Sequence, residues 1–226
     1  MTVYYKATRL DGFDFYTGKT INYADAVGGR VAVPNRRGKA GCCTNSVLHA
    51  SDMPTETLIG GSWPCRLFEV TGRPVAQKDH KFGFRSLRVV REVEAWQALG
   101  PQGREVAALV ERATRLTLDE AERLAAAWYA ARGAARYAAE DAAWYAAGGA
   151  ARYVARDAAG HAAWGAAWYA VRGAAGGAAR DVARDVARAL VVRDRIGDRF
   201  TQAHYDTLTG PWATAIGPAH PEDVAA

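Results

Sequence analysis

The chain has 226 residues, half of them apolar, so it is long enough to bury one large hydrophobic core or two small ones. Residues 1–100 carry 14 Lys and Arg against 9 Asp and Glu, a net charge of +5, whereas residues 101–226 carry 15 against 15 and are neutral. This excess favours an acidic partner for the first part, such as a phosphate backbone, and fits an ordinary protein surface equally well.

Composition also excludes several locations and cofactors. The first residues, MTVYYKATRLDG, contain no apolar signal-peptide core, and no run of about 18 apolar residues lacks a charge, so we expect no membrane span. The three cysteines include an adjacent pair, which disfavours disulfides, so we expect reduced thiols and a cytoplasmic location. No zinc-loop spacing links Cys42, Cys43 and Cys65 with His49 and His80, so we expect no metal site.

The first hundred residues alternate β-rich runs with turn signals, which predicts an α+β domain with a small mixed sheet. Five strands are expected, at Val3–Thr8, Arg30–Val33, Ser46–Ala50, Cys65–Val70 and Ser86–Val93. Short helices are expected at Asn22–Val27 and Pro54–Ile59.

In the strand Ser86–Val93, strict alternation assigns the side chains to two faces. It predicts one face with Leu87, Val89 and Arg91 and the other with Arg88, Val90 and Glu92.

The pattern turns helical at Glu94, with a break at Gly100-Pro101, so we expect a boundary between two domains, 1–100 and 101–226. An amphipathic helix is expected over Gly103–Leu116. Thr117 and Glu120 have the spacing of a capping box, which predicts the start of another helix.

An internal repeat follows. From Trp128 to Ala187 the chain consists of fifteen four-residue units whose third and fourth positions are always Ala or Val. In an α-helix, a period of four moves the small-residue stripe by about 40° per unit, so one straight partner cannot follow it. We therefore expect a bundle or hairpin of long alanine-rich helices, broken at glycine pairs, without excluding one unbroken rod.

The segment after residue 199 leaves the repeat. Its apolar residues, Phe200, Tyr205, Leu208, Trp212 and Ile216, are expected to cap one end of the helical bundle. Pro218–Ala226 is expected to be a loose tail.

One set of polar residues resembles the layout of ADP-ribosyltransferases. Lys6 lies on the first strand, His49 and Ser51 follow a middle strand, and Glu92 and Glu94 end a late strand. The resemblance implies that NAD is gripped by the early residues and that a late glutamate stabilises an oxocarbenium-like transition state. The sequence departs from the family where Lys6 replaces Arg or His and where His49-Ala50-Ser51 replaces Ser-Thr-Ser.

A second candidate is the basic, glycine-containing loop around residues 30–41. Arg30, Arg36, Arg37 and Lys39 are candidates for binding the phosphates of a nucleic acid, or form a plain basic loop. The loop lacks the order of a P-loop, so nucleotide hydrolysis is not expected.

Four segments resemble uncharacterised proteins of phages and high-GC bacterial genomes that carry an alanine-rich region of variable length. They are YYKATRLDGFDFYTG, LHASDMPTETLIGGSWPCRLFEV, LRVVREVEAWQALGPQG and HYDTLTGPWATAIGP. The resemblance implies a phage or prophage accessory protein and carries no activity.

Three functions are therefore considered. The favoured one is a non-enzymatic interaction protein, with an α+β recognition module and alanine-rich helices that contact a protein partner or another copy. The alternatives are an NAD-dependent ADP-ribosyltransferase that modifies a host macromolecule, and a nucleic-acid-binding protein.

The repeat gives a direct test of the predicted architecture. We expect the circular dichroism spectrum of a fragment covering residues 102–226 to be strongly helical, because alanine has the highest helix propensity. A mostly disordered spectrum would reject the helical bundle.

Overall fold

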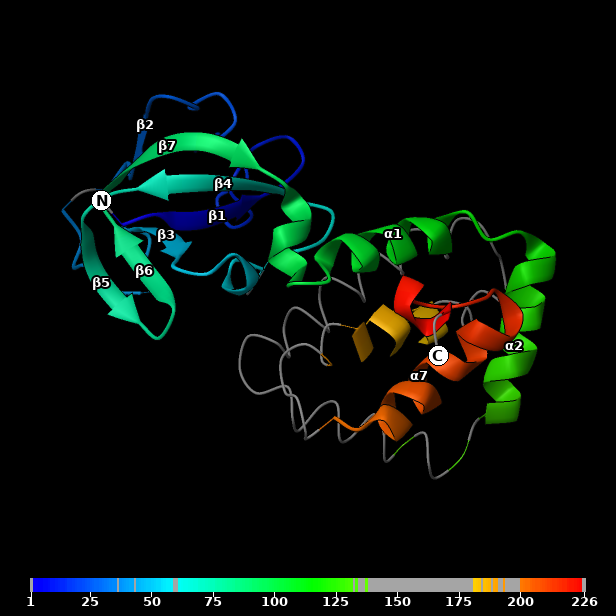
Figure 1. Ribbon diagram of the computed structural model, residues 1–226. Coiled ribbons are helices and arrows are strands. Elements are labelled where there is room, and N and C mark those ends of the chain that lie inside the picture. The colour runs from blue at the N-terminus through cyan, green and yellow to red at the C-terminus, as the bar shows by residue number, and fades with distance from the viewer. Residues whose placement is uncertain are drawn as a thin grey trace. The chain divides into compact units, whose positions relative to one another are not determined.

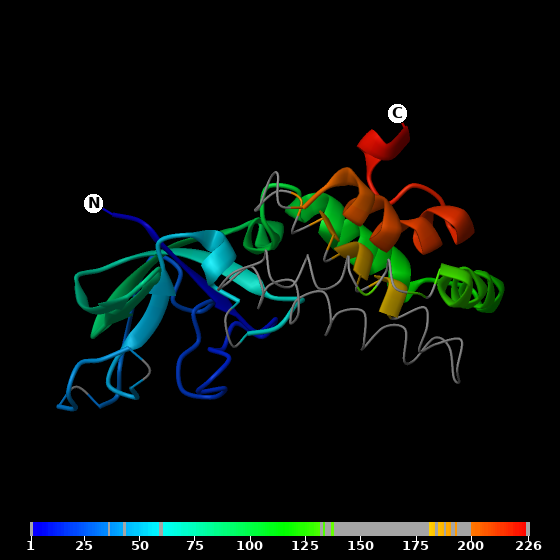
Figure 2. The same ribbon diagram turned by 90° about the horizontal axis from the view of Figure 1, so that it is seen from below.

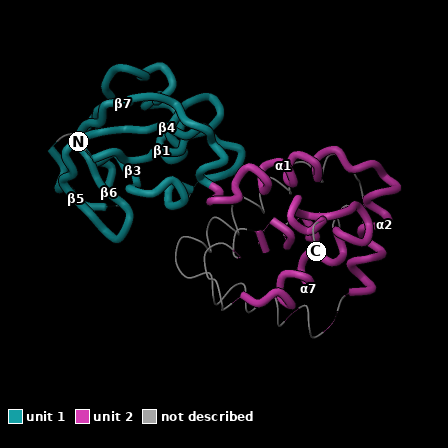
Figure 3. The backbone as a smooth tube through the Cα atoms, viewed as in Figure 1, with its two compact units in different colours: residues 1–98 teal, residues 99–226 magenta. Residues whose placement is uncertain are grey.

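The computed structural model describes residues 2–35, 37–42, 44–58 and 61–131, single residues and short pieces between 133 and 193, and residues 200–224. The chain divides into two compact units, residues 1–98 and 99–226 (Figure 3), where the sequence predicted a boundary at residue 100. The α+β class is confirmed. The alanine-rich repeat lies almost wholly outside the described residues, so its long helices stay a prediction.

The first unit is built on a seven-stranded sheet of order β2-β7-β4-β1-β3-β6-β5 (Figure 1). All neighbouring strands are antiparallel, so the expectation of a mixed sheet was wrong. The strands are β1 (Tyr4–Thr8), β2 (Arg30–Ala32), β3 (Leu48–Ser51), β4 (Arg66–Thr71), β5 (Pro74–Lys78), β6 (Lys81–Phe84) and β7 (Ser86–Val93).

Five of these strands match the predicted ones, and the hairpin of β5 and β6 was missed. Its turn contains Asp79 with a φ of 51°, and polar and charged residues around it give a loop-like sequence. Because β6 pairs with β3, the hairpin joins the sheet despite its polar sequence, and β5 is the edge strand.

The expected helix over Asn22–Val27 is absent among the described residues, which form turns and isolated bridges there. The Asn22 Oδ1 accepts hydrogen bonds from the backbone N–H groups of Ala24 (2.9 Å) and Asp25 (3.3 Å), as at a helix start, but the turn does not continue because Val27 bridges Val89 and Gly28 has a φ of 80°. The other expected short helix is a 3₁₀ turn, η1 (Pro54–Glu56), and a second 3₁₀ helix, η2 (Ala95–Leu99), follows β7.

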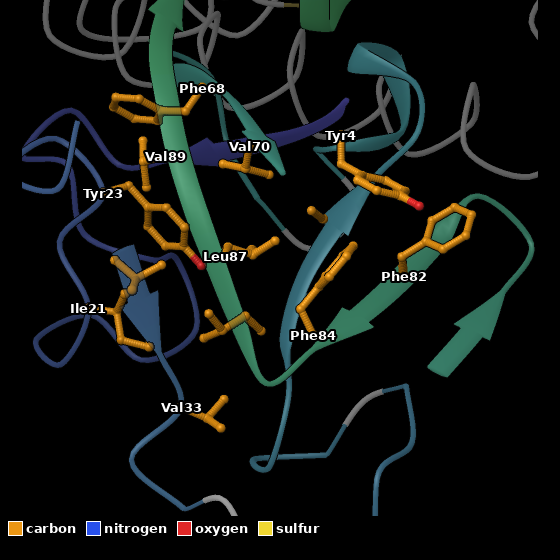
Figure 4. Close-up of a cluster of buried hydrophobic side chains, with 13 residues drawn as sticks. Tyr4, Ile21, Tyr23, Val33, Phe68, Val70, Phe82, Phe84, Leu87 and Val89 are labelled. Atoms are coloured by element: carbon orange, nitrogen blue, oxygen red, sulfur yellow. The ribbon is translucent and has the colours of Figure 1, made fainter. Parts of the chain in front are cut away.

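The hydrophobic core of the first unit lies on one face of this sheet and under the loops that cover it (Figure 4). The ring of Tyr4 in β1 lies 4.9 Å, centroid to centroid, from the rings of both Phe82 and Phe84 in β6, so these two strands meet through aromatic contacts. The other members are Ile21, Tyr23, Val31, Val33, Leu48, Ala50, Phe68, Val70, Leu87 and Val89.

A bulge in the β4–β7 pair changes which side chains of β7 share a face. Val70 pairs with Val89 and Phe68 pairs with Glu92, so one extra residue is inserted in β7. Because paired residues lie on the same face, Glu92 shares the core face with Val89. The prediction that placed Arg91 with Leu87 and Val89 was therefore wrong beyond the bulge.

The second unit contains the helices α1 (Gly103–Thr114), α2 (Leu118–Ala131) and α7 (Gln202–Ala215) and the 3₁₀ turn η5 (Pro221–Val224). The predicted capping box is confirmed: the Glu120 N–H donates to Thr117 Oγ1 (3.2 Å), and the Thr117 N–H donates to the Glu120 carboxylate (3.0 Å). No helix in the described residues is both long enough and apolar enough for a membrane crossing.

The C-terminal segment is more ordered than expected. Phe200, Tyr205, Leu208 and Trp212 are buried, and α7 lies beside α2 in both views (Figures 1 and 2). The expected loose tail instead contains η5, whose Asp223 accepts hydrogen bonds from the Tyr205 hydroxyl (3.1 Å) and from the backbone N–H of His220 (2.9 Å).

Gly72 tests how closely the end of β4 packs. A Cβ at Gly72 would lie 2.9 Å from the Ser86 carbonyl oxygen and 3.0 Å from Phe84 Cδ1. We expect Gly72→Ala to lower the free energy of unfolding of the first unit by about 1–3 kcal/mol. Hydrogen exchange of the β4 and β7 amides measures this locally.

Gly41→Ala is the matched control for this substitution, because its Cβ would meet only ordinary contact at 3.4 Å from Thr44. Equal amide protection in both variants would contradict the close packing at Gly72.

Candidate functional site

A cleft opens where strands β1 and β3 separate. In the described structure these strands share a single ladder pair, Tyr5 with Ser51, whereas β1 pairs with β4 along its whole length. The cleft has a volume of about 390 Å³ and is lined by Lys6 of β1 and His49 of β3, among others. Loop residues with apolar side chains, including Phe15, Ile21 and Val47, complete its walls.

Lys6 enters this cleft as half of an ion pair with Asp14. Both side chains are nearly buried, with exposures of 12% and 13%, and the Lys6 ammonium also lies 5.5 Å from the centroid of the Tyr23 ring. Burial alone would raise the pKa of Asp14, but the charge and hydrogen bond of Lys6 outweigh it and the pKa is lowered. Asp14 is therefore ionised at pH 7, and its charge balances that of Lys6.

The loop that carries Asp14 is shaped by the same carboxylate. Asp14 Oδ1 accepts hydrogen bonds from the backbone N–H groups of Tyr16 (2.9 Å) and Thr17 (3.0 Å). Tyr16, held by this turn, is 94% exposed and also lines the cleft. The turn therefore places an exposed aromatic ring at the edge of the site.

His49 is uncharged at neutral pH. Burial, followed by the positive charges of Lys81 and Lys6, lowers its pKa to about 4. An imidazole with this pKa donates and accepts hydrogen bonds at pH 7, but it is a weak general base. The residue therefore suits ligand binding better than proton transfer.

The structure brings three of the five predicted catalytic residues together and leaves two elsewhere. Lys6, His49 and Ser51 all line the cleft, although the Ser51 hydroxyl donates a 2.7 Å hydrogen bond to the His80 carbonyl. Glu92 and Glu94 line a different, shallow depression of about 510 Å³.

Glu92 is held there by Arg66, whose guanidinium donates two hydrogen bonds of 2.8 and 2.6 Å to its carboxylate. The hydrogen bonds from Arg66 lower the pKa of Glu92. The carboxylates that do line the β1–β3 cleft are Asp14 and Glu56.

The predicted nucleic-acid contacts are spread over a strand and a loop. Arg30 begins β2, Arg37 and Lys39 are exposed in the following loop, and Arg36 lies outside the described residues. The loop is tied to the sheet by Arg85, which donates hydrogen bonds to the carbonyls of Ser46 (2.7 Å) and Gly38 (2.5 Å).

Sequence analysis missed Asp14, Tyr16, Glu56 and Lys81 as cleft residues. The only local signal was at Asp14, because an aspartate that begins a tight turn before glycine often bonds nearby backbone N–H groups. The others become neighbours only when β1, β3 and β6 form one sheet.

Within the described part of the chain, no three His, Cys, Asp or Glu side chains come together as a metal site would require. Cys42 and Cys65 are free thiols. Of the residues predicted to act on NAD, Lys6, His49 and Ser51 line the cleft.

Comparison with protein-family models, with curated proteins and with solved structures finds no match to this chain. The function is therefore argued from the geometry of the site.

The lowered pKa of His49 predicts a pH dependence of stability. Above about pH 6.5 the imidazole is neutral in both states, but between pH 6.5 and 4 the unfolded chain binds a proton that the folded chain excludes. Stability is therefore lost as the pH falls. We expect the loss between pH 7 and pH 5 to be about 1 kcal/mol smaller in His49→Gln, allowing for solvent screening of the partly exposed ring.

Urea unfolding of both proteins at the two pH values measures the difference. The other four histidines are common to both proteins and cancel. An identical loss in wild type and variant would show that His49 is not held in its neutral form.

Proposed function

We propose that this chain is a non-enzymatic accessory protein of phage or prophage type, whose first unit is a recognition module that binds a small polar ligand in the β1–β3 cleft. The observation that carries the proposal is the separation of β1 and β3 after one ladder pair, which leaves a cleft of about 390 Å³. Cavities of this size are typical of small-molecule sites.

The charges of the cleft favour a ligand without net charge. Its lining residues with a formal charge are two lysines, Lys6 and Lys81, and two carboxylates, Asp14 and Glu56, so the charges cancel. The neutral His49 imidazole adds a hydrogen-bonding group. Binding in such a site depends on shape, apolar contact and directed hydrogen bonds.

The exposed ring of Tyr16 indicates the kind of ligand. A tyrosine that is 94% exposed beside a cleft loses little when it stacks on a planar group. A heterocycle attached to a polar sugar, as in a nucleoside, matches both the aromatic edge and the uncharged interior. We therefore assign the ligand to the nucleoside class.

An ADP-ribosyltransferase is the second candidate, because Lys6, His49 and Ser51 share the cleft. That activity would need a carboxylate beside the reacting ribose, and the glutamate at this cleft is Glu56, whereas Glu92 is paired with Arg66. The weak basicity of His49 and the compensated charge of Lys6 favour binding over catalysis.

The alanine-rich segment completes the proposal. We assign it the role of a spacer or assembly surface that contacts a protein partner or a second copy through small side chains. The free thiols of Cys42 and Cys65 accord with a cytoplasmic location.

Calorimetric titration with nucleosides and with NAD tests the function. We expect a nucleoside to bind to the full-length protein, and Tyr16→Ala to weaken binding by about tenfold, since stacking on one aromatic ring contributes about 1–3 kcal/mol. Tyr129→Ala is the matched control, because Tyr129 is 53% exposed on α2 in the other unit.

Release of nicotinamide from NAD separates the two candidates. We expect none from the wild-type protein. If the wild-type protein releases nicotinamide, and Glu56→Gln abolishes the release whereas Glu92→Gln retains it, the first unit is an enzyme and the recognition-module proposal is wrong. Equal binding by wild type and Tyr16→Ala, or no binding of any ligand, would contradict the nucleoside assignment.

A further inference from the structure

A second depression, of about 670 Å³, lies in the first unit and is lined by four arginines. Arg30 comes from β2, Arg73 follows β4, Arg85 directly precedes β7, and Arg88 lies near the start of β7. No acidic side chain is among its lining residues. The depression is therefore positively charged, in contrast to the β1–β3 cleft.

Strand register places like charges directly against each other there. Arg88 of β7 pairs with Arg30 of β2 on one side and with Thr71 of β4 on the other. Because paired residues of antiparallel strands share a face, these three side chains form one row across the sheet. Two like charges at directly opposed positions destabilise a sheet unless an anion lies between them.

Arg30 and Arg88 differ from neighbouring arginines of the sheet, which have acidic partners. Arg66 and Arg91, on the same two strands, each form a bidentate ion pair with a glutamate. Arg30, Arg73 and Arg88 form no ion pair with any residue that the structure describes. Their guanidinium groups are exposed and available to an external anion.

Thr71 gives an independent indication of a ligand. Its side chain is 5% exposed, and its hydroxyl has no hydrogen-bond partner within the described residues. Leaving a buried hydroxyl unpaired costs about 1–3 kcal/mol, so such groups usually have a partner. If the long arginine side chains reorient, an anionic oxygen can reach Thr71 and accept a hydrogen bond from its hydroxyl.

The basic loop extends the positive surface. Arg85 lines the depression and at the same time binds the carbonyls of Gly38 and Ser46, which fastens the loop that carries Arg37 and Lys39 to the edge of the site. Neither of these two residues forms an ion pair with the described residues. The cations therefore continue beyond the depression itself.

We propose that Arg30, Arg73 and Arg88, with Thr71, form a phosphate-binding site on the outer face of the sheet. An extended phosphodiester strand fits this surface, because the arginine row is open and continues toward the basic loop. Guanidinium groups bind phosphate oxygens through paired, charge-assisted hydrogen bonds. This site is separate from the cleft and does not depend on its ligand.

Fluorescence anisotropy with a labelled single-stranded oligonucleotide tests the proposal on the full-length protein. We expect the double variant Arg30→Gln/Arg88→Gln to bind about tenfold more weakly at low salt. Its slope of log K against log salt should fall by about 1.4, because each lost phosphate contact on a single strand removes about 0.7. Arg91→Gln is the matched control, since it removes a charge from the same strand but from an ion pair with Glu69.

Thermal unfolding shows whether weaker binding by the double variant comes from loss of the site or from loss of the fold. We expect the double variant to have an unchanged or raised Tm, since it removes two opposed like charges. A titration with inorganic pyrophosphate distinguishes the source of the phosphate. One outcome is that pyrophosphate binds to the wild type but not to the double variant, and that the oligonucleotide binds to neither. This outcome supports the site and identifies its ligand as a small phosphate compound. If neither probe binds to the wild type, or if the double variant binds as well as Arg91→Gln, the proposal is overturned.

Discussion

The pairing of β4 with β7 is the constraint on which the rest of the first unit depends. Before the bulge, Leu87 and Val89 enter the core while Arg88 faces the opposite side, beside Thr71 and Arg30. After the bulge, Glu92 shares the face of Phe68 and pairs with Arg66, whereas Arg91 pairs with Glu69 on the other face. One inserted residue thus separates arginines that have a carboxylate partner from one that has none. If β7 kept strict alternation without the bulge, Arg91 would lie on the face of Leu87 and Val89, away from its partner Glu69.

The two sites differ in how their charges are balanced. In the cleft, Lys6 and Asp14 neutralise each other in a nearly buried pair, and His49 avoids charge altogether because burial and neighbouring lysines lower its pKa. Such a site recognises hydrogen-bonding pattern and shape. In the arginine row the charges are exposed, uncompensated and in part directly opposed. A site of that kind attracts anions and weakens with salt. The same small sheet therefore carries both proposed sites, one with balanced charges and one with an excess of positive charge.

In the second unit, features that depend on neighbouring residues were predictable from sequence, and features that depend on tertiary contacts were not. The capping box of Thr117 and Glu120 acts through bonds within four residues, so it was predicted from sequence and is confirmed in the structure. The C-terminal tail depends on contacts across 18 residues, where the Tyr205 hydroxyl bonds Asp223, and its order was not predicted. The apolar residues of α7 were recognised in the sequence, but their packing against α2 is a property of the fold.

Sequence patterns alone predicted the α+β class, five of the seven strands, the helices α1 and α2 and the location of the excess positive charge, because these follow from composition and from patterns a few residues long. It also identified Lys6, His49 and Ser51, which share a cleft, but grouped them with Glu92 and Glu94, which do not line it. Three features became visible only in the fold: β1 and β3 separate after one pair, Asp14 neutralises Lys6, and Arg30 opposes Arg88. The β1–β3 separation and the Arg30–Arg88 opposition depend on strand register between segments far apart in the chain, where a shift of one residue would place every side chain on the opposite face. The Lys6–Asp14 pair depends on the loop after β1, which brings Asp14 back to that strand.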